Sequence, residues 1–409
     1  MKVVALGGAG RYCRPALEIL AESGLVSEIV IAGRSLTGAE ATVAALSASH
    51  PQTAWHAAQA DVREPGSLRP LLEGAALLLN TTGPYFLTLL PALEAAIAAG
   101  AHYLDYSEDG RAAEAALRLS GRAETAEVTA LIGMGEAPGL NNLLCRHAAE
   151  RLDRCDRLET GWIEDVESLL GDARESLAEI EQSGRVNGAM QAVLQAFAEN
   201  PRYYRDGALR ETAPFAEKRV LPVPGDAEGG TEMEGVVVGF AEPVTLPRRL
   251  TSLREMVSVA ALSPPPVNQL IRQVCTRMAA GEVVAADAAV EVFTALAEQP
   301  ERWLAGERDP AYRPHSVVAT GEKDGRPARI VATFRWDFAT LETREGIGTA
   351  AGFGEAAKAI LGGKIAARGV VTPEACFDPL PFLESLAEKH ALFLNDGKGP
   401  VEARLDWLD

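Results

Sequence analysis

The sequence predicts an α/β fold, with an N-terminal doubly wound parallel sheet followed by an α+β region. Two observations predict it. Short apolar runs alternate with helical patterns from the first residues up to Pro138-Gly139, and a glycine cluster follows the first of these runs. Beyond that point the pattern changes to longer helices and a hairpin signal. Alternating strands and helices with short connections favour a parallel sheet.

The composition supports a large folded interior and limits the function. The chain has 409 residues, 47% of them hydrophobic, which at roughly 100–200 residues per domain predicts two or three domains. The formal net charge of −18 repels nucleic acids and anionic membrane surfaces at long range, so neither is an expected partner. An anionic cofactor remains possible, because a helix N-terminus or one arginine can bind its phosphates locally.

Cysteine usage and the start of the chain predict the compartment. The five cysteines are scattered without a CxxC pair, so neither a disulfide framework nor a metal site is predicted. Met1 and Lys2 are followed at once by an apolar run, which leaves no room for a secretory signal. The sequence has no apolar stretch long enough to span a bilayer. A cytoplasmic protein is therefore expected.

The first third of the chain carries the predicted parallel sheet. Apolar runs bounded by glycine or polar residues are typical of buried parallel strands, and Ala-rich amphipathic stretches between them predict the helices. The expected strands cover 2–6, 28–32, 54–60, 76–79, 102–106 and 129–133, and the expected helices cover 15–23, 39–47, 91–99 and 111–125.

The remainder predicts an α+β region with antiparallel pairing. Lys323-Asp324-Gly325 between two apolar runs is a strong hairpin signal. The expected strands are 158–163, 236–240, 255–261, 316–321 and 328–335, and the expected helices are 140–152, 174–200, 267–278, 283–298, 346–361 and 381–389.

The glycine cluster predicts a dinucleotide site. Gly7, Gly8 and Gly10, with Arg11 and Tyr12, lie between an expected strand and an expected helix, the context that gives such a motif meaning. Gly7 or Gly8 allows the tight turn, and Gly10 lets backbone N–H groups approach a pyrophosphate at the helix N-terminus. The usual third glycine is replaced by Cys13, which we interpret as a small buried residue rather than a nucleophile.

The ends of the second and third strands predict the cofactor. Folds that prefer NAD usually place an acid after the second strand to bind the ribose hydroxyls, but here Arg34 and Ser35 follow it. This pair suits a 2′-phosphate, so NADP(H) is preferred, with NAD(H) as the alternative. Asp61 and Val62 follow the third strand and suit the adenine amino group, although Asp61 is also a plausible helix cap.

Polar residues also follow the fourth strand. Ligands of such sheets bind at the carboxyl ends of the strands, so this segment is expected to face the cofactor, unless it is only a polar loop. The residues concerned are Asn80, Thr81, Gly83 and Pro84.

Four segments together resemble the saccharopine dehydrogenase (saccharopine reductase) superfamily, whose members include carboxynorspermidine dehydrogenase and lysine 6-dehydrogenase. The resemblance is clearest over residues 1–145 and weaker at 242–248 and 371–376. The segments are Gly33-Arg34-Ser35, Gly83-Pro84-Tyr85-Phe86, Ala101-His102-Tyr103-Leu104-Asp105-Tyr106-Ser107 and Gly133-Met134-Gly135-Glu136-Ala137-Pro138-Gly139.

The resemblance implies a three-part organisation and C–N chemistry. It implies a Rossmann domain (1–140), an α+β substrate and dimerisation domain (141–365), and a C-terminal segment (366–409) that returns to the Rossmann domain. It also implies a homodimer that reduces an imine or oxidises an amine, with a small amine or amino acid as substrate. Saccharopine reductases carry an acid immediately before the Pro-Gly pair, where this chain has Ala137, which disfavours saccharopine itself.

Candidate site residues follow from this chemistry. An imine nitrogen needs a general acid, and Tyr85, Asp105, Tyr106 and Glu136 fall at expected strand ends. Tyr85 is the first choice, with packing beside Phe86 as the alternative. A substrate carboxylate is best held by a bidentate arginine, and the candidates, which could also be plain surface charges, are Arg248, Arg249 and Arg344.

Two other functions remain open at this point. Some proteins that resemble this superfamily are trans-acting enoyl reductases, which act on carrier-bound acyl chains. A sensor that binds NADP(H) without turnover is the other alternative, since a fold does not dictate a function.

Overall fold

The chain forms two compact units, each with its own sheet. The computed structural model describes residues 1–64, 66–184, 186–223, 231–263, 266–303 and 314–408. Unit 1 comprises Met1–Leu143 and Arg335–Pro400, and unit 2 comprises Leu144–Phe334 and Val401–Asp409. The sequence-based boundaries lie after residues 140 and 365, so the two divisions differ most in where the chain re-enters unit 1.

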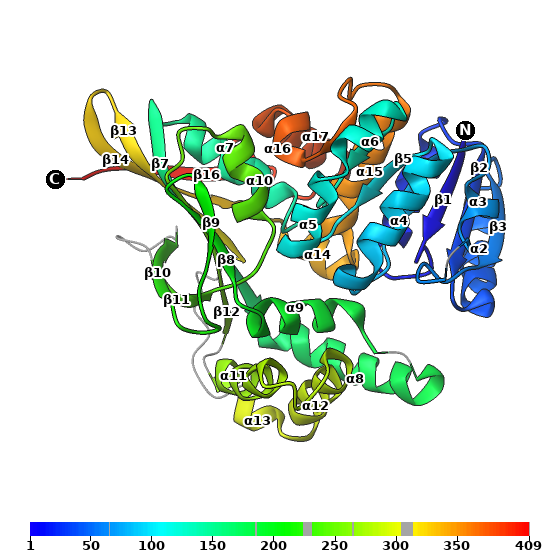
Figure 1. Ribbon diagram of the computed structural model, residues 1–409, viewed down its shortest axis with the longest axis horizontal. Helices are drawn as coiled ribbons and strands as arrows, with labels where there is room; N and C mark the ends of the chain where they lie inside the picture. The colour runs from blue at the N-terminus through cyan, green and yellow to red at the C-terminus, as the bar shows by residue number, and fades with distance from the viewer. Residues whose placement is uncertain (65, 185, 224–230, 264–265, 304–313, 409) are drawn as a thin grey trace. The chain divides into compact units, whose positions relative to one another are not determined.

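Unit 1 contains a seven-stranded, wholly parallel sheet (Figure 1). Its strand order is β15-β6-β5-β4-β1-β2-β3, which reverses direction between β1 and β4. This confirms the predicted doubly wound sheet, and it places the topological switch point, where such folds bind their ligands, between those two strands. The strands are β1 (Lys2–Leu6), β2 (Glu28–Gly33), β3 (Ala54–Gln59), β4 (Ala75–Asn80), β5 (His102–Asp105), β6 (Thr129–Leu131) and β15 (Gly369–Val371).

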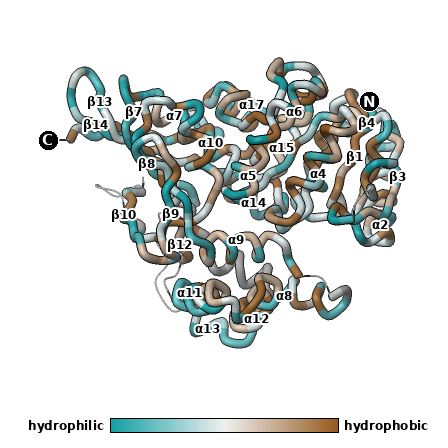
Figure 2. Tube along the Cα trace, viewed as in Figure 1, coloured by the Kyte–Doolittle hydropathy of each residue, from teal (hydrophilic) through white to brown (hydrophobic). Residues whose placement is uncertain are grey.

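The strands of unit 1 form where apolar residues run without alternation. Val3, Val4 and Ala5 of β1 are fully buried, and Figure 2 shows the hydrophobic run along this strand. Such runs are typical of strands covered on both faces. The covering helices are α1 (Arg14–Glu22), α2 (Leu36–Ser49), α3 (Arg69–Leu72), α4 (Tyr85–Ala99), α5 (Gly110–Leu117) and α6 (Ser120–Thr125), followed by α7 (Leu140–Glu150), which crosses the boundary between the units.

One predicted helix, 111–125, is two helices in the structure. The N–H groups of Arg118 and Leu119 donate to carbonyls three residues back. This tighter pattern ends α5 before α6 begins, and such turns are frequent at helix ends.

The C-terminal return adds a strand and several helices to unit 1. These are α14 (Phe338–Thr343), α15 (Ile347–Leu361), β15, α16 (Pro373–Cys376) and α17 (Pro379–His390). Helix α15, orange in Figure 1, packs directly on α1. A Cβ on Gly354 of α15 would lie only 3.0 Å from Cγ2 of Ile19. The chain therefore re-enters unit 1 before α15, a helix that the sequence-based division assigns to the middle domain.

Unit 2 is built on a nine-stranded mixed sheet. Its main order is β10-β11-β12-β7-β13-β14-β16, with β8 pairing to β12 and β9 pairing to β8. The predicted hairpin is confirmed as the antiparallel pair β13–β14, but β7 and β12 run parallel. The strands are β7 (Arg154–Asp165), β8 (Arg202–Arg205), β9 (Ala208–Glu211), β10 (Lys218–Val223), β11 (Thr231–Val237), β12 (Glu255–Ser263), β13 (His315–Lys323), β14 (Arg326–Phe334) and β16 (Val401–Trp407).

The helices of unit 2 supply its main hydrophobic core. Phe293 and Leu296 of α12 are fully buried against α9 and α11. The predicted helix 174–200 is two helices, and the Asn187 side chain caps the second of them. The helices are α8 (Val166–Ser183), α9 (Gly188–Ala198), α10 (Glu242–Arg249), α11 (Pro266–Ala279), α12 (Ala285–Glu298) and α13 (Pro300–Trp303). In the described ranges, no helix is both long and apolar enough to cross a membrane.

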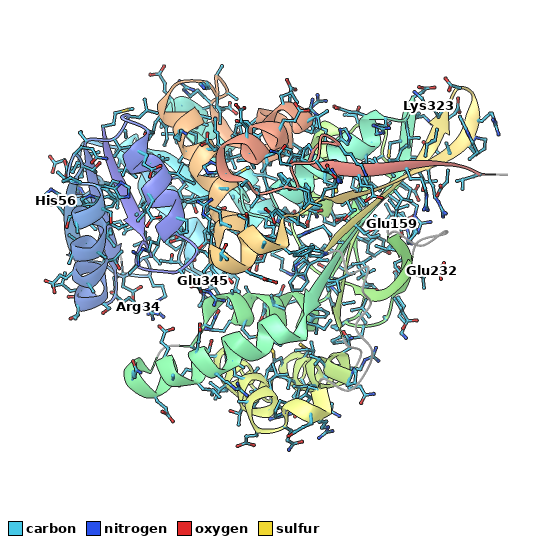
Figure 3. All side chains as sticks on the ribbon, turned by 180° about the vertical axis from the view of Figure 1, so that it is seen from behind. Arg34, His56, Glu159, Glu232, Lys323 and Glu345 are labelled. Carbon is cyan, nitrogen blue, oxygen red and sulfur yellow. The ribbon has the colours of Figure 1, made fainter. Side chains whose placement is uncertain are left out.

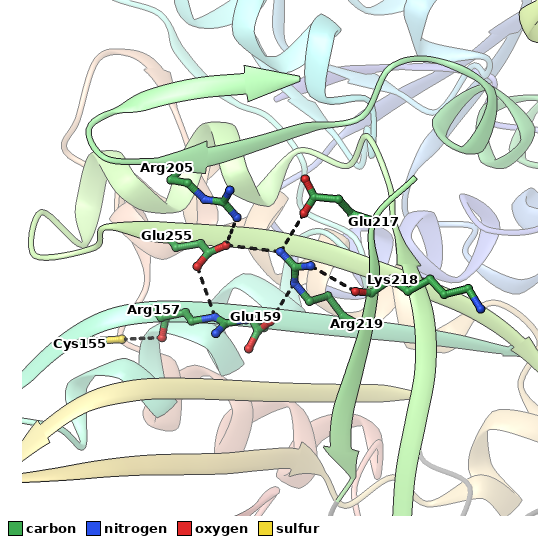
Figure 4. A network of polar contacts seen from close by, with 8 residues as sticks. All are labelled: Cys155, Arg157, Glu159, Arg205, Glu217, Lys218, Arg219 and Glu255. Carbon is green, nitrogen blue, oxygen red and sulfur yellow. Dashed lines mark hydrogen bonds and ion pairs between the residues drawn. The ribbon is translucent and has the colours of Figure 1, made fainter. Parts of the chain in front are cut away.

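An ion-pair network crosses one face of the unit 2 sheet (Figure 4). Oε1 of Glu255 lies 2.6 Å from Nη2 of Arg205 and 3.5 Å from Nη2 of Arg219, and its Oε2 lies 3.5 Å from Nε of Arg157. Burial by itself raises the pKa of Glu255, but the three arginines hold it below its usual value. The network consists of Arg157, Arg205, Arg219, Glu159, Glu217 and Glu255.

We expect Glu255→Gln to lower the free energy of unfolding of unit 2 by about 1–3 kcal/mol, because three partly buried guanidinium groups lose their shared anion. Glu234→Gln is the matched control. Glu234 pairs with Lys218 while 59% of its side chain is exposed, so a loss below about 1 kcal/mol is expected. Chemical denaturation of both variants measures the difference, and equal losses would contradict the prediction.

Candidate functional site

The turn after β1 has the geometry of a dinucleotide loop. Gly7 has φ +78°, and a Cβ on it would lie 2.9 Å from the backbone of Thr81. A Cβ on Gly8 would lie 2.9 Å from Ala5. Gly10 is exposed at the tip, and its carbonyl accepts the N–H of Arg14, the first residue of α1. The backbone here is thus packed too closely for side chains, and it leads straight into the N-terminus of α1.

Cys13 lies where dinucleotide motifs usually have their third glycine. The side chain is fully buried, and this burial raises the pKa of its thiol to about 12 despite a hydrogen bond with Thr81. The residue therefore stays protonated at neutral pH. Cys13 is thus a small, buried side chain at the N-terminus of α1.

Arg11 and Tyr12 are held by a segment more than 300 residues away. Nη2 of Arg11 donates to the Tyr12 hydroxyl at 2.8 Å, and its guanidinium lies 4.8 Å from the centre of the Tyr12 ring. Nη1 of Arg11 lies 3.2 Å from Oε1 of Glu345, which Figure 3 labels near the yellow-orange helical segments. A Cβ on Gly346 would lie 3.1 Å from the Arg11 carbonyl oxygen. The turn before α15 thus packs on the dinucleotide loop.

The residues predicted to bind the adenosine end lie at neighbouring strand ends. Arg34 is exposed directly after β2. Oγ of Ser35 accepts the N–H of Gly38 at 3.1 Å and caps α2. Val62 is buried, and the Asp61 carboxylate forms a two-point ion pair with Arg63. Arg63, the other member of this ion pair, was not among the residues predicted from the sequence.

The segment after β4 mainly ties the strand ends together. Nδ2 of the fully buried Asn80 donates to the Tyr103 hydroxyl at 3.0 Å, while its Oδ1 accepts the Thr82 N–H. Both the N–H and Oγ1 of Thr81 donate to the Leu6 carbonyl. Gly83 and Pro84 then lead into α4. These contacts fix the loop after β4 against the loop after β1.

Asp105 is a structural hub at the end of β5. Its Oδ1 accepts the N–H groups of Ser107 and Gly133 at 3.0 and 2.7 Å, and its Oδ2 accepts the Tyr103 hydroxyl at 2.8 Å. Burial raises the pKa of Asp105 to about 6, against these three hydrogen bonds. The carboxylate therefore joins the ends of β5 and β6, and Tyr103 links it to Asn80 at the end of β4.

Tyr85 belongs to an aromatic cluster with Tyr106 and Phe353. The ring centres of Tyr85 and Tyr106 are 5.8 Å apart, and those of Tyr106 and Phe353 are 5.2 Å apart, both edge to face. The Tyr85 hydroxyl donates to the Asn80 carbonyl at 3.2 Å. Burial raises the pKa of Tyr85 well above its usual value, which weakens it as a proton donor near neutral pH.

Glu136 lies in a folded loop between β6 and α7. The N–H of Gly135 donates to the Pro138 carbonyl, and the N–H of Leu140 donates back to Gly135. Glu136 is half-buried, and its Oε2 lies so close to Gly348, in the first turn of α15, that a Cβ there would overlap it. Burial raises the pKa of Glu136 to about 7.

A third carboxyl group with a raised pKa, that of Glu108, follows β5. Burial, with the charges of Asp109 and Asp105, raises the pKa of Glu108 to about 8. Glu108 also interacts electrostatically with Tyr85. Perturbed carboxyl groups gathered at strand ends are typical of functional sites. The acidic run Glu108-Asp109 directly after the Tyr106-Ser107 pair was the available sequence signal.

The arginines predicted to bind substrate do not belong to one unit. Arg248 and Arg249 end α10 of unit 2 and are exposed, and Arg249 lies 3.9 Å from Glu150. Arg344 lies in unit 1, where its Nη1 donates to the His390 carbonyl at 3.0 Å. Of the three, only Arg344 is thus on the same unit as the strand ends described above.

Comparison with known proteins also indicates a dinucleotide-binding domain at the start of the chain. Residues 3–131 match the family described as the saccharopine dehydrogenase NADP binding domain. The structure is similar to apo saccharopine dehydrogenase (L-Glu forming) from Saccharomyces cerevisiae, with 14% identity, 99% of each chain covered and a TM-score of 0.60. It is also similar to homospermidine synthase from Legionella pneumophila in complex with NAD, with 12% identity, 98% of this chain and 91% of the other covered, and a TM-score of 0.55.

These matches confirm the family resemblance noted in the sequence. Residues 3–131 therefore match an NADP-binding domain of the saccharopine dehydrogenase family, and the whole chain shares its fold with the two similar structures.

Proposed function

We propose that this protein uses NADP(H) to reduce an imine, or to oxidise an amine, at a C–N bond of a small amine or amino acid. The observation that carries the proposal is the position of Glu136. Its half-buried carboxyl group, with a pKa raised to about 7, adjoins the first turn of α15. The turn just before that helix packs on the dinucleotide loop at Arg11 and Tyr12.

The glycine loop fits a dinucleotide. Gly7 and Gly8 bring the backbone close to β4 and β1, and α1 begins directly behind the loop. A helix N-terminus of this kind favours a pyrophosphate. When bound, the nicotinamide supplies or accepts the hydride. The exposed Arg34 after β2 supports a 2′-phosphate there, and hence a preference for NADP(H) over NAD(H).

Glu136 is the proposed proton donor for the substrate nitrogen during reduction, and the proton acceptor in the reverse direction. A general acid works best when its pKa lies near the working pH, which favours Glu136 over Tyr85. Asp105 has a positioning role, because all its described bonds hold strand ends together.

The comparisons support the C–N chemistry. Saccharopine and homospermidine, named in the descriptions of the two similar structures, are both secondary amines. A homodimer, with Arg248, Arg249 or Arg344 holding a substrate carboxylate, is part of the same proposal.

The test is absorbance of the reduced cofactor against a panel of oxo acids and aldehydes with amines, and of amino acids and polyamines, in both directions. We expect turnover with one carbonyl and amine pair, or with one amine, and a preference for NADPH over NADH. Turnover only with a carrier-bound enoyl chain would contradict the C–N assignment. Tight NADPH binding without any turnover would favour a sensor.

A further inference from the structure

The ends of β2 and β3 are joined at the point where Arg34 leaves the sheet. Gly33 of β2 is in register with Gln59 of β3. The N–H of Ala60 donates to the Gly33 carbonyl at 2.9 Å, and Nε2 of Gln59 donates to the Arg34 carbonyl at 3.1 Å. The loop that follows β3 is therefore held beside Arg34.

That loop presents a second guanidinium group. Nε and Nη2 of Arg63 donate to the two carboxylate oxygens of Asp61 at 3.1 and 2.7 Å. The Arg63 N–H donates to the same carboxylate at 3.0 Å. The Arg63 side chain is nevertheless 52% exposed, and its Nη1 takes no part in the two-point pair with Asp61. Arg63 is thus oriented by Asp61 while its guanidinium still reaches solvent.

Arg34 and Arg63 surround one carboxylate. The Arg63 hydrogen bond, together with the charges of Arg63 and Arg34, lowers the pKa of Asp61 to about 2. The three side chains together carry one net positive charge, on a chain whose net charge is −18. The ion pair thus holds a half-exposed guanidinium in place while leaving it accessible to a ligand.

We propose that Arg63 is a second cation of the 2′-phosphate site, that Asp61 holds it in position, and that Arg34 and Arg63 together set the preference for NADP(H). The adenosine ribose of a dinucleotide lies at the end of the second strand, beside both residues. A planar guanidinium binds phosphate oxygens in pairs. This inference rests on the proposed NADP(H) preference and adds a residue to it.

The experiment compares binding of NADPH and NADH by calorimetry, with 2′,5′-ADP and 5′-AMP as fragments that differ only in the 2′-phosphate. Arg63→Gln is expected to weaken the binding of NADPH and of 2′,5′-ADP about 10- to 100-fold, the range of a charge-assisted hydrogen bond. NADH and 5′-AMP are expected to change less than twofold. Arg63→Lys keeps the charge without the planar group, and its affinity for NADPH is expected to lie between those of wild type and Arg63→Gln.

Arg118→Gln is the matched control. Arg118 is also an exposed arginine of unit 1 in an ion pair, with Glu114 on α5, so it tests the effect of lost net charge alone. We expect less than a twofold change for either cofactor.

The outcomes separate this inference from the proposed function. If Arg34→Gln weakens binding of NADPH but Arg63→Gln does not, the proposal that Arg63 is a second cation of the site is wrong, and the proposed cofactor preference stands. If Arg63→Gln weakens NADPH and NADH equally, Arg63 does not read the 2′-phosphate, and the inference is overturned. If the wild-type protein prefers NADH, both the preference and the inference fail.

Discussion

Glu136→Gln is expected to lower kcat/KM about 10²- to 10⁴-fold, the usual contribution of a general acid or base. The amide keeps the size of the side chain beside Gly348, but its N–H protons are not acidic enough to be transferred to the substrate. Cofactor binding should stay within a few-fold of wild type, which stopped-flow or equilibrium titration measures. A fall in kcat/KM with unchanged cofactor affinity would show that the variant has lost proton transfer while its cofactor site is intact.

The pH profile gives an independent readout of the same residue. Burial raises the pKa of Glu136 to about 7, and the protonated form is the one that donates during imine reduction. The wild-type kcat/KM for reduction should therefore fall as the pH rises through about 7, and Glu136→Gln should lose this limb.

Two variants complete this test. Glu94→Gln, which removes an exposed carboxylate of α4 that pairs with Arg122 of α6, serves as the control and should retain wild-type kinetics. An active Glu136→Gln with the wild-type pH profile, alongside an inactive Tyr85→Phe, would assign the proton to Tyr85 instead.

Asp105→Ala is expected to lower the free energy of unfolding of unit 1 by about 3–5 kcal/mol, because it leaves two buried N–H groups and the Tyr103 hydroxyl without their acceptor. Asp105→Asn should cost less, about 1–2 kcal/mol, since its Oδ1 can still accept both N–H groups. Chemical denaturation monitored by circular dichroism measures both. Equal and small losses would show that Asp105 does not hold the strand ends.

Asp105 also makes a pH dependence of stability testable. Its pKa is raised from 3.8 to about 6 in the folded protein, so the folded state binds this proton more tightly than the unfolded chain. The resulting stability is present below about pH 4 and is lost as the pH rises to about 6, by up to about 3 kcal/mol. Wild type should therefore lose more stability than Asp105→Asn over this interval. An identical slope in both proteins would contradict the raised pKa.

Much of unit 1 was predictable because its signals are local. Buried parallel strands such as β1 and β4 appear in the sequence as continuous apolar runs. The glycines after β1 indicate a turn whose backbone is packed too closely for side chains. Arg34 could be placed at a strand end because a strand and its following turn are consecutive in sequence. In unit 2, Lys323-Asp324-Gly325 located the β13–β14 hairpin for the same reason.

The sequence was less informative where elements meet at long range. Helical periodicity predicted α15, but it does not say which sheet a helix covers, so residues 346–361 were grouped with the middle region. Strand β16 was missed, although it pairs with β14 over seven residues. Its strict alternation of apolar and charged residues is the usual pattern of a half-buried strand, so this signal was available in the sequence.

The sequence by itself thus determined the doubly wound sheet, its glycine loop, the family resemblance of the first domain and the candidate residues at the strand ends. Only the tertiary structure decided their surroundings. It surrounds Asp105 with three donors, sets Glu136 against Gly348, pairs Arg11 with Glu345 and pairs Arg63 with Asp61. The reason is physical: burial and neighbouring charges set a side chain's hydrogen bonds and pKa, and most of those neighbours come from distant parts of the chain.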